Sequence, residues 1–66
     1  MSEVMLEDYN WYPCTITGRS EALDYDGYRL NAELTEDITI KPDGKKPYHL
    51  KVGFKFIDCH RDCIRE

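Results

Sequence analysis

The sequence contains no glycine-rich phosphate-binding loop and no nucleophile elbow, and only two of its 66 residues are histidine. The recurring constellations of enzyme active sites are therefore missing. A chain of this length builds its core from about ten side chains, which leaves little room for a deep ligand pocket. We therefore expect a protein that is not an enzyme and carries no cofactor.

Long apolar runs are also absent. No run approaches the ~20 residues of a membrane-spanning helix, so no membrane association is expected. The acidic start, Met1-Ser2-Glu3, lacks the charged and apolar regions of a secretory signal. The three cysteines cannot all pair within one chain. These features predict a cytoplasmic protein with reduced thiols.

Basic residues are fewer than acidic residues. Nine lysines and arginines stand against 13 aspartates and glutamates, which gives a net charge of −4 and a pI near 5.0. General nucleic-acid binding normally requires a basic domain or stripe. Acidic residues dominate up to Asp37, however, and basic residues outnumber them after it. This split predicts a basic partner for the first half or an acidic one for the second, unless the two faces pair with each other.

The apolar residues recur with period two, which is the spacing of β-strands. Strands are expected over residues 11–18, 28–34, 37–41 and 48–57, with turns at 24–27 and 42–44. Residues 18–23 fit either one helical turn or a continuation of the first strand through a bulge at Gly18. Gly53 predicts a bulge or a bend inside the last strand, as expected where a strand curls round a small barrel. Residues 1–10 are expected to form a loose lead-in, and residues 59–65 a closing helical turn.

These elements predict one domain over residues 1–66, mainly β: a small, antiparallel, partly open barrel of four or five strands with a short C-terminal helical turn. The alternative is an α+β sheet with one packed helix. The expected core consists of Cys14, Ile16, Leu30, Ala32, Leu34, Ile38, Ile40, Leu50, Val52, Phe54 and Phe56. Pro13 lacks a backbone donor, so the strand over residues 11–18 should start at Pro13 or lie at a sheet edge. An exposed edge there would permit a weak homodimer; otherwise the protein is a monomer.

Two cysteines and a histidine stand close together in the C-terminal stretch IDCHRDCIRE. Cys59 and Cys63 share one face if this tail is helical, and with Cys14 and His60 or His49 they would supply four zinc ligands. Zinc sites commonly bring their ligands in close pairs, and a second pair is missing. Three hypotheses stay open: apolar anchors of the tail, a metal-stabilised domain, and a redox or regulatory thiol pair.

Aromatic and acidic side chains cluster in the first half of the chain. The candidate partner-binding surface consists of Trp11, Tyr12, Asp24, Tyr25, Asp26 and Tyr28. Exposed aromatic rings beside carboxylates bind arginine and lysine through cation–π contacts and ion pairs. This surface predicts a larger protein partner with a basic surface. The alternative is that Trp11 closes one end of the core and the tyrosines lie along its margin.

Lysines dominate the second half. The candidate nucleic-acid-binding residues are Lys45, Lys46, Lys51 and Lys55, of which the last two are expected on the outer face of the final strand. Such a face would bind phosphates of RNA or single-stranded nucleic acid. The alternative is protection of a sheet edge against aggregation.

The stretch DYNWYPCTITG, followed by DYDGYRLNAEL, resembles the opening of Tudor and other SH3-like barrels over residues 8–34. The matching positions are Asp8, Trp11, Tyr12, Ile16, Tyr25, Asp26 and Tyr28. The resemblance implies an SH3-like barrel that binds peptides, sometimes with methylated lysine or arginine, on aromatic residues at its loop ends. The chain departs from these families in its long final strand and cysteine tail.

YPC followed by DYD is also similar to the small bacterial Rho-binding antiterminators. That resemblance implies a compact acidic β protein that binds the transcription termination factor and blocks its RNA site. Both resemblances imply a non-catalytic binding role, which the size and composition of the chain also favour. We therefore expect a protein-binding module or a small inhibitor or regulator of a larger protein.

Overall fold

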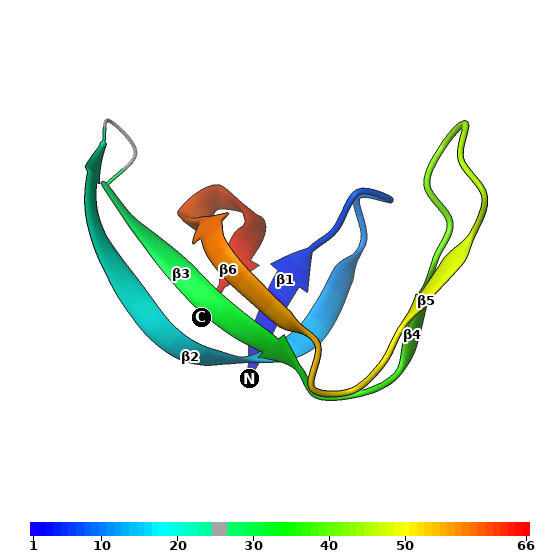
Figure 1. Ribbon diagram of the computed structural model, residues 1–66, viewed down its shortest axis with the longest axis horizontal. Helices are drawn as coiled ribbons and strands as arrows, with labels where there is room; N and C mark the ends of the chain where they lie inside the picture. The colour runs from blue at the N-terminus through cyan, green and yellow to red at the C-terminus, as the bar shows by residue number, and fades with distance from the viewer. Residues whose placement is uncertain (25–26) are drawn as a thin grey trace.

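The computed structural model describes the backbone of residues 1–24 and 27–66 and the side chains of residues 1–19 and 29–66. The described strands are β1 (Ser2–Met5), β2 (Trp11–Asp24), β3 (Gly27–Leu34), β4 (Ile38–Ile40), β5 (Tyr48–Leu50), β6 (Lys55–His60) and β7 (Ile64–Arg65). A 3-10 helix, η1 (Arg61–Cys63), connects β6 to β7. The strands form an antiparallel five-stranded sheet, in the order β6-β3-β2-β1-β7, and a two-stranded sheet of β4 and β5 (Figure 1). The expectation of a mainly β, antiparallel protein is confirmed.

The five-stranded sheet is strongly curled. Its two edge strands, β6 and β7, are joined only by η1. The four Cα steps from His60 to Ile64 span at most about 14 Å. A flat sheet would hold its first and fifth strands about 19 Å apart. The edges must therefore curl toward each other, and Figure 1 shows β2 and β3 bending as long ribbons. Among the described residues β6 and β7 do not pair, so the sheet stays open.

Bulges in β2 contribute to this curl. The pairing of β2 with β3 shifts register between Ile16 and Gly18, and again between Ser20 and Asp24. A bulge increases local twist and bends its strand. Of the two alternatives for residues 18–23, continuation of the strand through a bulge at Gly18 is therefore confirmed. A Cβ at Gly18 would lie 3.4 Å from the side-chain nitrogen of Asn31, so the glycine allows a close approach.

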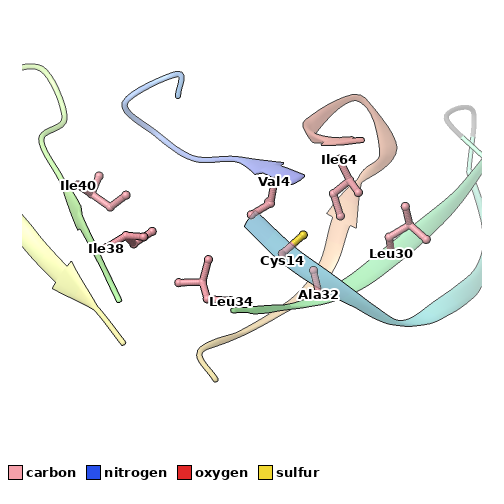
Figure 2. Packing of buried hydrophobic residues seen from close by; sticks show 8 residues of the cluster. All are labelled: Val4, Cys14, Leu30, Ala32, Leu34, Ile38, Ile40 and Ile64. Atoms are coloured by element: carbon pink, nitrogen blue, oxygen red, sulfur yellow. The ribbon is translucent and has the colours of Figure 1, made fainter. Parts of the chain in front are cut away.

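The core lies on the inner side of the curl, and the β4–β5 hairpin contributes Ile38 and Ile40 at one side of it (Figure 2). Its buried members are Val4, Cys14, Leu30, Ala32, Leu34, Ile38, Ile40 and Ile64. Ile16, Leu50 and Phe56 pack against them while partly exposed. The expected core is thus confirmed for most positions but not for Val52 and Phe54, which are exposed.

The expectation of a loose lead-in over residues 1–10 is wrong. β1 pairs with β2 from Ser2 opposite Cys14 to Met5 opposite Trp11, and it pairs with β7 on its other side. Val4 is 1% exposed. A strand with one buried side chain gives almost no periodic signal, and one of its two partners, β7, comes from the opposite end of the chain.

The single strand expected over residues 48–57 is also wrong, because β5 and β6 are separate. Between them Gly53 has φ 89°. Its N–H donates to the carbonyl of Leu34 at 2.9 Å, and the N–H of Phe54 donates to that of Lys51 at 3.0 Å. Gly53 therefore makes a turn rather than a bulge. The turn moves the chain from the two-stranded sheet to the edge of the larger one.

Two further expectations are corrected. The closing helical turn is only the three residues of η1, after which the chain returns to the sheet as β7. The strand that begins at Trp11 is not an edge strand, because β2 lies between β1 and β3. Pro13 is accommodated there because the β2–β3 ladder ends at Cys14 opposite Leu34. Its carbonyl still accepts a hydrogen bond from the N–H of Thr35 at 3.3 Å.

Candidate functional site

An apolar groove of about 540 Å³ lies on the open side of the curled sheet. Its lining comes from β1 and the turn after it, from β5, from β6 with the residue before it, and from η1. Val4, Leu50 and Phe56 form apolar parts of this lining. Glu7 is the only carboxylate among the described lining residues, and none of these is lysine or arginine. The groove therefore offers apolar contact with one site of negative charge.

Two exposed aromatic residues belong to the groove lining. Tyr9 is 78% exposed and Phe54 is 44% exposed. The Phe54 ring contacts the ring of Phe56, with centroids 5.0 Å apart and planes tilted by 58°. This is a favourable aromatic geometry, and it links the exposed ring to one that packs on the core. The groove thus presents a continuous aromatic surface from solvent to the interior.

Tyr9 stands on a strained backbone. Its φ is 63°, a left-handed conformation that costs a residue with a Cβ about 1–2 kcal/mol. The turn from Leu6 to Asn10 holds it there: the N–H of Tyr9 donates to the Leu6 carbonyl at 2.9 Å, and the N–H of Leu6 donates to the Asn10 carbonyl at 3.2 Å. Glycine would occupy this position without strain. Backbone strain of this kind is concentrated at functional sites, where it fixes a side chain in place.

Glu7 joins two parts of the groove lining. The Tyr48 hydroxyl donates a hydrogen bond to one carboxylate oxygen of Glu7, and the Lys45 ammonium lies 3.1 Å from the other. We call these three residues the Glu7 clasp. The clasp connects the turn after β1 to the β4–β5 hairpin. The Tyr48 hydrogen bond, followed by Lys45, holds the pKa of Glu7 below its ordinary value, and the same bond raises the pKa of Tyr48 to about 12.

The clasp is expected to open in acid. Because the pKa of Glu7 is lower in the folded protein than in the unfolded chain, its stabilising effect is complete above the ordinary value of 4.5. This stabilisation is lost as the pH falls through the lowered pKa that Glu7 has in the folded protein. An NMR titration should show the Tyr48 ring resonances moving with the Glu7 carboxyl below pH 4.5, and Glu7→Gln should abolish that movement. A Tyr48 signal that moves identically in Glu7→Gln would contradict the clasp.

The three cysteines occupy one region, near the end of the groove formed by β6 and η1. All three are free thiols; Cys14 is buried in the core, and Cys59 and Cys63 are half-buried and line the groove. Burial raises the pKa of the Cys14 thiol, and the nearby Cys59 adds to the effect. Burial also raises the pKa of Cys59, with a further contribution from Cys63. Such thiols react slowly, which favours the packing hypothesis for Cys14 and Cys59.

The two histidines make local contacts. The ring nitrogen Nδ1 of His60 accepts a hydrogen bond from the N–H of Asp62 at 3.0 Å, which caps η1. Nδ1 of His49 lies 2.9 Å from the Thr39 hydroxyl on the two-stranded sheet. Among the described residues, no group of three or more histidine, cysteine, aspartate or glutamate side chains is arranged to hold a metal ion.

Alkylation should distinguish the thiols. Cys14 is expected to resist iodoacetamide in the native protein, because its side chain is buried and its pKa is raised. Cys59 and Cys63 are both partly exposed in the groove lining, so both should react before Cys14, and the pKa of Cys59, which burial raises, should slow its reaction. Mass spectrometry of peptides after timed labelling measures each rate, and unfolding in urea should make the three rates alike. Rapid native labelling of Cys14 would contradict its place in the core.

The described residues of the candidate acidic-aromatic surface lie near the two ends of β2. Tyr12 packs against the core and its hydroxyl donates to Asp8. Trp11, its neighbour in the strand, points to the other face, where the Arg65 guanidinium lies 3.9 Å from the ring centroid. Asp24 is the last residue of β2 and Tyr28 is the second residue of β3, so the backbone of both lies at the opposite end of the β2–β3 hairpin (Figure 1). Residues 25 and 26, and the side chains of Asp24 and Tyr28, lie outside the described part of the structure.

The candidate nucleic-acid-binding lysines are exposed but do not form one stripe. Lys45 pairs with Glu7, and Lys55 lies opposite Glu33 in the β3–β6 pairing. Lys46 belongs to the β4–β5 connection and Lys51 to the turn before β6. The expected common face of Lys51 and Lys55 is lost because the strand that would carry both is interrupted.

Sequence reasoning did not single out the groove residues Glu7, Tyr9 and Phe54 as a site. Tyr9 was assigned to an unstructured lead-in, and Phe54 to the core through its alternation with Phe56. Gly53 could have revealed Phe54, because a glycine inside an alternating pattern can mark a turn that ends the strand before Phe54.

In the described ranges, no helix is both long and apolar enough to cross a membrane. No protein family, curated protein or solved structure matches the chain.

Proposed function

We propose that the chain is a non-catalytic protein-binding module, and that its open groove receives an apolar segment of a larger protein. The observation that carries this proposal is the groove itself, with Tyr9 and Phe54 exposed in its lining. Apolar surface gains about 25 cal/mol for each Å² removed from water, so a partner that covers these rings is favoured. Apolar patches of this kind in small soluble domains mark interaction sites.

The strain at Tyr9 supports the same conclusion. Packing does not explain the position of this side chain, because most of its surface is in solvent. The left-handed backbone sets the direction of the Cα–Cβ bond at Tyr9, and the ring lines the groove. The backbone at this position therefore needs no rearrangement when a partner covers the ring, which favours binding.

Charge complementarity specifies the partner further. Glu7 is the carboxylate of the described groove lining, and it is already paired with Lys45 and Tyr48. The chain as a whole has a net charge of −4. The bound segment is therefore apolar and comes from a partner with a basic surface, whose lysines or arginines meet the negative charge of the module. Negative charge on the module also accelerates the encounter with a basic partner.

The fold that we propose for this function is a partly open, SH3-like barrel. The short link between the two edge strands and the bulges of β2 support it, since both require a curled sheet. The groove then corresponds to the gap between the edges. A gap of this kind leaves an apolar interior accessible to a peptide.

Peptide display tests the proposed function. A random peptide library is selected against the wild-type protein, and the recovered peptides are measured against Phe54→Ser and Tyr9→Gly. Both variants should weaken binding at least tenfold, or about 1.4 kcal/mol. Tyr9→Gly removes the strained Cβ together with the ring, so it should fold at least as stably as the wild type. Loss of binding in this variant therefore reports the ring and not the fold.

Two matched control variants change exposed apolar side chains outside the groove. Val52→Ser and Ile57→Ser remove exposed apolar side chains that do not line the groove, and they should bind the recovered peptides within about threefold of wild type. The proposal is overturned if these controls lose as much affinity as Phe54→Ser. It is also overturned if the selection recovers no peptide that depends on Tyr9 or Phe54.

A further inference from the structure

The edge strand β6 borders the groove with an open side. Among the described residues its strand partner is β3, on one side only. Phe56, Cys59 and His60 line the groove, and no described residue of β2 or β3 does. The groove therefore lies on the side of β6 that faces away from β3. Because successive residues of a strand direct their backbone groups to opposite edges, about half of the N–H and C=O groups of β6 point toward this side.

The opposite rim of the groove is the end of β1. β7 pairs with β1 at Glu3 and Val4, whereas Met5 and Leu6 continue past the last of these pairs. Both residues line the groove. The groove is thus the place where the curled sheet stops short of closing, with an edge strand on one side and the end of a strand on the other.

We propose that the partner's segment binds in an extended conformation, as a strand added along the open edge of β6. This inference rests on the proposed function and specifies its mode of binding. Backbone hydrogen bonds to β6 would supply affinity with little dependence on sequence. Alternate side chains of the segment would lie against Leu50 and Phe56 in the groove, and the others would point to solvent. The added strand continues the five-stranded sheet into the gap.

A bulge limits the length of the added strand. The β3–β6 pairing shifts register between Leu30 and Ala32, and opposite this shift Asp58 has φ 56°. The N–H of Asp58 donates to the side-chain oxygen of Asn31 at 3.0 Å, so it is occupied on the β3 side. Bulges protect sheet edges from long, indiscriminate pairing. The bound segment is therefore short, about four to six residues.

The test uses a synthetic peptide of about six alternating valines and lysines with blocked ends. Two further peptides carry N-methyl groups, one on the odd and one on the even residues. N-methylation removes the backbone donors of one edge of the peptide strand and leaves its side chains intact. Because only one edge can face β6, one methylated peptide should bind at least tenfold more weakly than the parent, and the other within about threefold. Binding of the parent should also slow hydrogen exchange of β6 amides.

Each other result has a definite meaning. If both methylated peptides bind like the parent, strand addition is wrong while side-chain docking in the groove survives. If the parent binds wild type and Phe54→Ser equally, the proposed groove function fails. If the parent does not bind at about 1 mM, strand addition is overturned, and the display selection decides the proposed function separately.

Discussion

Replacing Leu30 by alanine is expected to remove a large part of the protein's free energy of unfolding. Leu30 is fully buried in β3, opposite Arg19 of β2 and Cys59 of β6. Truncating a buried leucine to alanine costs about 2–5 kcal/mol, because the removed methyl groups leave a cavity. A domain of 66 residues has a total free energy of unfolding of about 3–10 kcal/mol. One core substitution of this kind therefore removes a large part, or all, of the free energy of unfolding.

Urea denaturation measures this effect, with the fluorescence of Trp11, the only tryptophan, as the probe. The matched control is Ile57→Ala on the edge strand β6, where the side chain is 66% exposed. This control should change the free energy of unfolding by less than about 0.5 kcal/mol. If Leu30→Ala and Ile57→Ala have equal midpoints, Leu30 is not a core residue and the curl of the sheet is wrong.

Val4→Asp should lower the free energy of unfolding at least as much as Leu30→Ala, although Val4 is only the fourth residue of the chain. The Val4 side chain is buried between β2 and β7, opposite Tyr12 and Ile64. An unpaired carboxylate cannot be buried there without a cost of several kcal/mol, so the native state would lose β1 and with it the attachment of β7. Circular dichroism and amide NMR spectra of the variant should be those of an unfolded chain at neutral pH.

Ile57→Asp is the control for this substitution. It introduces the same charge on β6, at a residue that is 66% exposed, and should leave the unfolding midpoint close to that of wild type. A folded Val4→Asp protein would restore the expectation of a loose N-terminal segment. The pair of variants thus separates the effect of burial from the effect of added charge.

The periodic strands could be predicted from the sequence because their alternation is local. Leu30, Ala32 and Leu34 alternate over one strand, and Ile38 and Ile40 over the next, and all five are buried. The mainly antiparallel fold follows from such strands and the turns between them.

β1 and the split of the last strand could not be predicted in the same way. β1 pairs with β2 through a short hairpin and with β7 from the opposite end of the chain, and only one of its four residues, Val4, is buried. One buried side chain gives no alternation, and the pairing with β7 leaves no mark in a local pattern. Residues 48–57 alternate as one strand, yet Phe54 and Phe56 belong to different environments because Gly53 turns the chain. The groove depends on both features, so its lining residues escaped prediction as a site.

The candidate acidic-aromatic surface was predicted from the residue types in the first half of the chain. Residue types alone do not show on which face of a sheet each side chain lies. Trp11 and Tyr12 are neighbours in sequence, but the pleat of β2 places their side chains on opposite faces. The carboxylate that reaches an apolar groove is instead Glu7, in a turn that has no motif of its own. Its role depends on Tyr48 and Lys45, which follow about forty residues later.

Chemical-shift mapping with a display-selected peptide tests the groove most directly. The protein is labelled with ¹⁵N and titrated with the peptide, and backbone amide shifts are followed along the chain. We predict the largest changes in the turn that carries Tyr9, in β5, and from Phe54 to Cys63, with little change in the middle of β2. Largest changes at the Asp24–Gly27 end of the β2–β3 hairpin, or at Lys46 and Lys51 alone, would contradict the groove as the binding site.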